Sequence, residues 1–188
     1  MEEKDNIMFH ILFWGNFIPL QGVEYIIRAA KILENDKNII FTLIGSGQTF
    51  NQVKKEADNL KVRNVRFLGK LPVGELPPFI SKADVCLGIF GDTDKAQRVI
   101  PNKVYEAIAM TKPVITGDTP AIRELFTDRE NILLCQTADP NDLAEKILEL
   151  KDSDTLRNRI ARGGYEIFQE YAIPKVIAQK FIAELKIL

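Results

Sequence analysis

Residues 98–106, with the sequence RVIPNKVYE, combine charged side chains with a helix start in a pattern suited to a phosphorylated ligand. Asn102 follows Pro101 and precedes an amphipathic stretch, so we expect its side chain to cap a helix. The N–H groups of the first helical turn then favour an anion. Lys103 places a cation in that turn, where it is unfavourable without such a ligand. We therefore interpret Lys103 as an anion ligand; the alternative is a solvated surface lysine.

Glu106 lies one helical turn further on, beside Tyr105 and a run of small and apolar residues. A carboxylate in this place can accept hydrogen bonds from a cis-diol, as acidic residues do with ribose in nucleotide-binding folds. The alternative is a glutamate that only stabilises the start of its helix.

Two loops rich in glycine follow apolar runs. Gly15 and Gly22 bound the loop GNFIPLQG, and Gly45 and Gly47 lie in the loop GSGQ. Glycines at a strand–loop–helix connection let the backbone approach a ligand closely and leave helix N–H groups open to an anion. A plain turn explains either loop equally well.

The elements that must position these residues follow from the alternation of short apolar runs with longer amphipathic stretches. Runs that are apolar at nearly every position are typical of parallel strands buried on both faces. This order predicts a Rossmann-like three-layer α/β/α fold with a six-stranded parallel sheet and extra C-terminal helices, and ligands of such folds bind at the carboxyl ends of the strands. The expected strands are 8–15, 39–45, 65–69, 83–90, 113–116 and 131–135, and the expected helices are 22–34, 49–60, 74–82, 102–110, 119–126, 139–150, 154–170 and 174–188.

Composition excludes several classes of protein. The chain has 188 residues, 46% of them hydrophobic, which is enough for one domain with a full core. The 25 Lys and Arg residues nearly balance 26 Asp and Glu, so we expect no nucleic-acid partner. No apolar run reaches the roughly 20 residues of a membrane span, and the acidic start MEEKDN lacks the features of a signal peptide. We therefore expect a cytoplasmic protein.

Metal and nucleophile chemistry have few candidate residues. Cys86 and Cys135 lie in apolar runs, so we expect buried thiols rather than a disulfide or a zinc site. His10, the one histidine, lies in an apolar run as a strand residue, which disfavours a Ser-His-Asp or Cys-His mechanism. Asp92 and Asp94 form an Asp-x-Asp sequence, but in a loop, and we expect no metal there.

Taken together and in order, several segments resemble the C-terminal, donor-binding domain of group 1 (family 4) glycosyltransferases of the GT-B fold. The resemblance implies a single nucleotide-sugar-binding domain over residues 1–188, whose partners are the nucleotide-sugar donor and a missing N-terminal acceptor domain. It implies a retaining hexosyl transfer in cell-envelope polysaccharide synthesis, no metal cofactor, and possible peripheral membrane association of the full-length enzyme. The matching segments are WGNFIPLQGVEYIIRAAKIL, FTLIGSGQ, NVRFLGKLPVGELPPFISKADVCLGIF, PNKVYEAIAMTKPVITGDTPAIREL and NILLCQTADPNDLAEKI.

The resemblance also implies roles for single residues. Glu106 matches the ribose-binding glutamate, whereas Arg98 stands where the family has a second glutamate. Asn16 and Gln21 stand where the family has a pyrophosphate-binding Arg and Lys. We therefore expect Arg98 and Lys103 to supply the missing charge as catalytic residues. The remaining donor-binding candidates are Gly15, Gly22, Gly45, Gly47, Lys70, Leu71, Phe90, Pro101 and Asn102, with the base read through the backbone near Lys70 and Leu71.

Two other functions stay open. One is a degenerate binding module that kept the fold and lost the donor site, as Asn16, Gln21 and Arg98 suggest. The other is an epimerase of nucleotide sugars, for which the sequence offers no acid–base pair. On the transferase interpretation, the isolated chain binds donor weakly and transfers little, because the acceptor domain is absent.

Overall fold

A computed structural model of the protein describes residues 8–185. Six parallel strands form one sheet in the order β3-β2-β1-β4-β5-β6. This confirms the predicted fold class, and every expected strand is present. The strands are β1 Phe9–Trp14, β2 Ile39–Ile44, β3 Val65–Phe67, β4 Val85–Leu87, β5 Val114–Gly117 and β6 Leu133–Cys135.

The central strand β1 has apolar side chains on both faces of the sheet. Phe9, Ile11 and Phe13 pack in one hydrophobic cluster, while Leu12 and Trp14 pack in the other. Because successive strand residues point to opposite faces, a strand covered on both sides is apolar almost throughout.

Strand β4 is shorter than the predicted run of residues 83–90. The N–H of Ile89 donates to the Thr116 hydroxyl at 3.1 Å instead of to a strand carbonyl. A side chain thus replaces a ladder partner, and regular pairing of β4 ends at Leu87, although the Ile89 carbonyl still accepts from the Gly117 N–H of β5.

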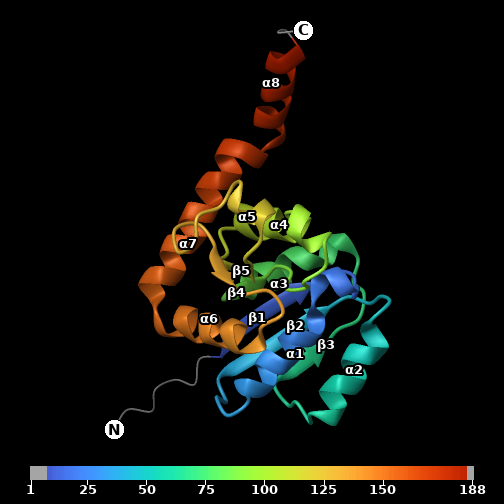
Figure 1. Cartoon of the computed structure of the whole chain (residues 1–188). Helices are drawn as coiled ribbons and strands as arrows, with labels where there is room; N and C mark the ends of the chain where they lie inside the picture. Colours follow the sequence, from blue (N-terminus) through green and yellow to red (C-terminus); the bar gives the residue numbers. More distant parts are fainter. Residues whose placement is uncertain (1–7, 186–188) are drawn as a thin grey trace.

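Helices cover both faces of the sheet (Figure 1). Helices α1 Val23–Ile32, α2 Phe50–Asn59 and α6 Pro140–Asp152 contribute to the cluster around Phe13 and Phe41, and α3 Leu76–Lys82, α4 Asn102–Ala109 and α5 Pro120–Arg123 to the cluster around Trp14. Helix α5 is a single turn, shorter than predicted, capped by the Thr119 hydroxyl. Helix α7 Asp154–Ile167 spans the two clusters, because its first half packs in one and Ile167 on the other.

The C-terminal helix α8 Pro174–Leu185 follows a π-helical turn, Phe168–Ala172, and projects away from the body of the molecule (Figure 1). The predicted end of this helix at residues 186–188 lies outside the described residues. Along α8, more than half of each of the Ile177, Phe181, Ile182 and Leu185 side chains is exposed. Within residues 8–185 no helix is both long enough and apolar enough to cross a membrane.

The structure also places the two cysteines and the histidine, the residues considered for nucleophile or metal chemistry. Cys86 and Cys135 are free and buried, as predicted. His10 is a residue of β1, as expected. It is exposed and lines a cavity of about 470 Å³ with Arg66 and Phe79 on one face of the sheet.

Candidate functional site

The sheet has its topological switch point between β1 and β4, where the strand order reverses. In open parallel sheets, the loops that leave the carboxyl ends of such neighbouring strands diverge and form a crevice for a ligand. The loop at Gly15 leaves β1 and the loop at Gly88 leaves β4. Most of the predicted site residues lie on these loops and on the two adjoining ones.

The glycines of these loops allow backbone segments to pack directly on each other. A Cβ atom at Gly45 would lie 1.9 Å from the Gly15 carbonyl oxygen, and one at Gly22 would lie 2.5 Å from the Gly91 nitrogen. Gly45 also has φ near +139°, a conformation that L side chains rarely adopt. The sequence analysis expected these glycines to let the backbone approach a ligand; at Gly45 and Gly22 the structure shows the close approach of another loop instead, and ligand contact stays a prediction.

Lys103 is buried at the switch point. Only 6% of the residue is exposed, and its Nζ lies between the two strand-end loops. Nζ donates to Gln21 Oε1, lies 3.5 Å from the Gly88 carbonyl oxygen and 3.7 Å from the centre of the Phe13 ring. The interpretation of Lys103 as a solvated surface lysine is therefore wrong.

The surroundings of Lys103 disfavour its charged form. Burial lowers the pKa of this amine well below its usual value, and the charge of Glu106 only partly opposes the effect. Among the contacts described for Nζ, none is to a carboxylate. The site therefore holds an amine that is either protonated or able to take up a proton, and its described contacts include no anionic partner.

The predicted N-cap of α4 is wrong by one residue. Pro101, with φ −73° and ψ 145°, takes the extended N-cap conformation, so the helix begins at Asn102 itself. No side chain caps this helix, and Asn102 is exposed. Because the proline side chain has no hydrogen-bond acceptor, the N-cap residue leaves the first-turn N–H groups of α4 without a side-chain partner.

Glu106 is held by a residue that the sequence analysis missed. Its Oε2 accepts a hydrogen bond of 2.6 Å from Nε1 of Trp14, the last residue of β1. Trp14 is only 4% exposed, whereas Glu106 is exposed on α4. A buried indole N–H normally needs an acceptor. That rule was the one signal in the sequence that Trp14 has a polar partner.

A cavity of about 120 Å³ adjoins this pair. Five predicted residues line it: Gly15, Asn16, Gly45, Lys70 and Leu71. Trp14, Ile44 and Leu76 give the same cavity apolar walls. The structure thus brings together residues from the carboxyl ends of three strands, next to the carboxylate of Glu106.

The remaining predicted residues lie elsewhere. Arg98 is exposed on a short 3-10 helix, Ala96–Arg98, and its Nε donates to the Asp94 carbonyl oxygen at 3.1 Å. Phe90 is buried in the core, so only its backbone is near the loops, where its N–H donates to the Gln21 carbonyl. Gly47 packs against the backbone of Phe17.

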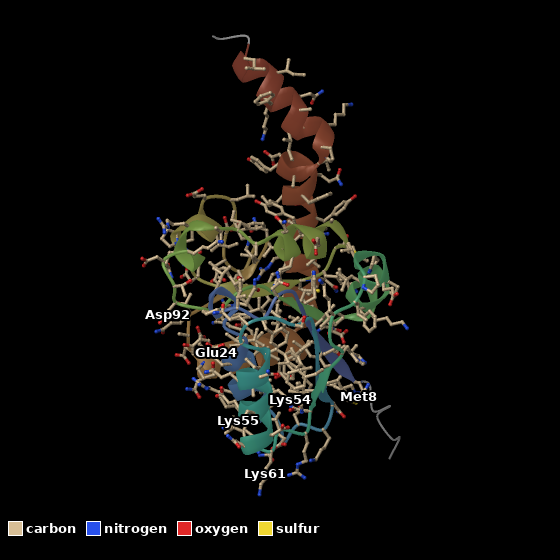
Figure 2. All side chains as sticks on the ribbon, turned by 90° about the vertical axis from the view of Figure 1, so that its right-hand side faces the viewer. Met8, Glu24, Lys54, Lys55, Lys61 and Asp92 are labelled. Atoms are coloured by element: carbon tan, nitrogen blue, oxygen red, sulfur yellow. The ribbon has the colours of Figure 1, made fainter. Side chains whose placement is uncertain are left out.

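Charged side chains outside the site are distributed unevenly. Lys54, Lys55 and Lys61 point outward at the α2 end of the molecule, apart from Asp92 in the loop after β4 (Figure 2). Desolvation, followed by the charges of Asp92 and Glu24, raises the pKa of Tyr25. The lysines of α2 and the following turn therefore do not contribute to the crevice, and the Asp92 loop adds negative charge near α1.

The fold is that of a glycosyltransferase domain. The chain belongs to the family described as "Glycosyl transferases group 1", whose model matches residues 2–167. It is 28% identical over 173 residues to the uncharacterized glycosyltransferase MJ1178 of Methanocaldococcus jannaschii, covering 88% of this chain and 45% of that protein. The chain thus spans less than half the length of that relative.

Solved structures share the fold. The C-terminal domain of the group 1 glycosyl transferase LpcC from Francisella tularensis has a TM-score of 0.74 at 20% identity, covering 88% of this chain and 87% of that one. HepE from Anabaena, in complex with UDP and glucose, has a TM-score of 0.82 at 17% identity, covering 96% of this chain and 49% of that one.

Proposed function

We propose that this chain is the donor-binding half of a retaining glycosyltransferase and that its crevice binds a nucleoside diphosphate sugar. The acceptor is then held by a second domain, in the part of the relatives that this chain does not span. The observation that carries the proposal is the buried amine of Lys103 at the switch point, with no carboxylate among its described contacts.

A diphosphate over the Gly15 loop gives Lys103 the anionic partner that it lacks. A Cβ built on Gly15 would lie 3.2 Å from Lys103 Nζ, so the amine is directly behind the backbone of that loop. The uncapped first turn of α4 adds N–H groups at the same crevice. A bound dianion would favour the charged form of Lys103, because an opposite charge offsets the cost of burying an ammonium.

With the diphosphate at Lys103, the ribose and the base of the nucleotide lie toward Glu106 and the adjacent cavity. Glu106 accepts from a ribose hydroxyl, and the base enters the cavity lined by Leu71 and Leu76. Asn16, which lines the cavity mouth, contacts the ligand as a neutral side chain. We extend the proposal to cell-envelope polysaccharide synthesis and to transfer without a metal ion on the family resemblance alone.

The proposed chemistry is electrostatic. As the bond from the anomeric carbon to the diphosphate breaks, negative charge develops on the leaving phosphate oxygen. A cation and helix N–H groups already directed at that oxygen lower the barrier, because they need no reorganisation at that moment. The acceptor oxygen forms the new bond to the anomeric carbon, and its proton passes to a group outside this chain. We expect Arg98, which is exposed on the 3-10 helix Ala96–Arg98, to add positive charge beside the ligand.

The test is a titration of the purified chain with UDP, GDP and ADP, each with and without Mg²⁺. Calorimetry or NMR shifts detect the weak binding expected of a half site. We expect one nucleotide to bind, and Lys103→Met and Glu106→Ala each to weaken it. Lys55→Met is the matched control, since Lys55 is an exposed lysine of α2 (Figure 2).

The competing function is a binding module that lost the donor site. Its evidence is the neutral Asn16 and Gln21, and it predicts no response to any of the three nucleotides. Binding that survives in both Lys103→Met and Glu106→Ala would place the nucleotide elsewhere and refute the proposed site.

A further inference from the structure

Trp14 has no role in the sequence predictions, yet it contacts two parts of the proposed site, the Glu106 carboxylate and the adjacent cavity. It is the single tryptophan of the chain and the last residue of β1. Its indole N–H donates to Glu106 Oε2 at 2.6 Å. The same side chain forms a wall of the 120 Å³ cavity with Leu71 and Leu76. One rigid ring therefore connects the cavity to the carboxylate.

The side chains of Trp14 and Glu106 differ in conformational freedom. Trp14 is fixed by burial in the hydrophobic cluster of α3 and α4, with 4% of the residue exposed. Glu106 is an exposed side chain with three rotatable bonds. A hydrogen bond from the fixed indole to Oε2 therefore selects one orientation of the carboxylate and leaves Oε1 to accept from another donor.

We propose that Trp14 is a positioning residue that holds Glu106 ready to accept from a ribose hydroxyl of a nucleotide whose base fills the adjacent cavity. The inference rests on the proposed function and adds a specificity to it. The site distinguishes a ribonucleotide from its deoxy counterpart through a carboxylate oriented in advance. Preorganisation of this kind raises affinity because less side-chain entropy is lost on binding.

The test compares the best-binding of UDP, GDP and ADP with its 2′,3′-dideoxy counterpart. Trp14→Phe keeps an aromatic wall but removes the N–H. We expect it to reduce the preference for the ribonucleotide roughly 2- to 12-fold, the effect of one neutral-strength hydrogen bond. Affinity for the dideoxy nucleotide should change less than twofold. A merely structural role would weaken both nucleotides equally.

Glu106→Gln completes a double-mutant cycle. If Trp14 acts through Glu106, the double variant Trp14→Phe/Glu106→Gln has the same preference as Glu106→Gln alone. Additive losses, or an unchanged preference in Trp14→Phe, would overturn the proposal.

A readout without nucleotide tests the contact itself. The chain has one indole N–H, so one ¹⁵N-labelled resonance reports on Trp14. We expect Glu106→Gln to shift it and Glu145→Gln, an exposed glutamate of α6, to leave it in place. An unmoved resonance in Glu106→Gln refutes the contact, even where Trp14→Phe proves too unstable to titrate.

The outcomes separate the two proposals. If the wild-type chain binds none of the nucleotides, the proposed function fails and the role of Trp14 fails with it. If the wild type binds and Trp14→Phe keeps the full ribonucleotide preference, the proposed function stands and only the role of Trp14 is lost.

Discussion

Replacing Lys103 by methionine should weaken nucleotide binding without weakening the fold. Methionine has nearly the length of the lysine side chain and removes only the amine. The amine has one short hydrogen bond, to Gln21, and a long contact of 3.5 Å to the Gly88 carbonyl. An ammonium with three donors is poorly satisfied by these partners, so its burial costs stability that the variant recovers.

Two opposite contributions set the net change in the free energy of unfolding. The variant leaves Gln21 Oε1 as a buried acceptor without Lys103, which costs about 1–3 kcal/mol. It also removes the desolvated amine. Because these effects are of similar size, we expect a net change within about 1–2 kcal/mol at neutral pH. For the diphosphate, a lost charge-assisted contact of about 1.5–3 kcal/mol raises the Kd roughly 10- to 150-fold.

The dependence of stability on pH gives an independent check. Burial lowers the pKa of Lys103 in the native state, while in the unfolded chain it stays near 10.4. Between those two values the unfolded chain binds the extra proton, so the wild type becomes more stable as the pH rises, by at most about 1.4 kcal/mol per pH unit. The Lys103→Met variant lacks this contribution.

Urea unfolding of wild type, Lys103→Met and Lys55→Met from pH 6 to pH 10 measures the effect. We expect the difference in unfolding free energy between wild type and Lys103→Met to change in favour of wild type as the pH rises. A constant difference over this range would refute the buried, uncompensated amine, and an unchanged Kd for the nucleotide would refute its contact with the diphosphate.

Three further predictions concern other contacts of the loops and the core. Gly45→Ala should lower the melting temperature severely or abolish folding, because its Cβ would lie 1.9 Å from the Gly15 carbonyl oxygen; Gly74→Ala, with nothing within 4 Å, is the control and should melt like wild type. The double variant Gln21→Lys/Lys103→Gln should bind the nucleotide more tightly than Lys103→Gln alone in calorimetry, because the two side-chain ends meet at one point; equal affinities would contradict this. The native Cys86 thiol should resist iodoacetamide at pH 8, since burial raises its pKa to about 12, and react only after unfolding, as mass spectrometry would show; rapid labelling of the folded chain would refute the burial.

The layered fold could be predicted because its signal is local. Phe9, Ile11 and Phe13 alternate with Leu12 and Trp14, and a strand that is apolar on both faces fits only between two layers of helices. The end of β4 could not be predicted in the same way, because it depends on the Thr116 hydroxyl of a neighbouring strand.

The sequence predicts which strand-end loops form the candidate site, but it does not predict which side chains contact each other there. The place of Lys103 in a helical turn predicts an anion site, whereas its hydrogen bond to Gln21, 82 residues earlier, depends on the whole fold. The bond between Trp14 and Glu106 joins residues 92 positions apart. No periodicity or motif in the sequence links residues so far apart. They meet because the parallel sheet brings β1 beside the start of α4.

These two contacts together explain how one strand and one helix set the geometry of the crevice. Phe13 and Trp14 are consecutive residues of β1 and so point to opposite faces of the sheet. Lys103 and Glu106 are three residues apart on α4, within one turn. The amine of Lys103 lies over the Phe13 ring, and the carboxylate of Glu106 accepts from the indole of Trp14.

Lys103, the proposed phosphate-binding cation, and Glu106, the proposed acceptor for the ribose hydroxyl, lie one turn apart on α4, and each contacts one of two consecutive residues of β1. Their relative position therefore depends on this helix and this strand. Both are rigid elements, and neither belongs to the loops that connect them. A nucleoside diphosphate carries both an anionic group for Lys103 and ribose hydroxyls for Glu106. The amine of Lys103 also bonds to Gln21 in the loop after β1, so lengthening the segment between Pro19 and Gly22 should move the amine while leaving the Trp14–Glu106 contact in place.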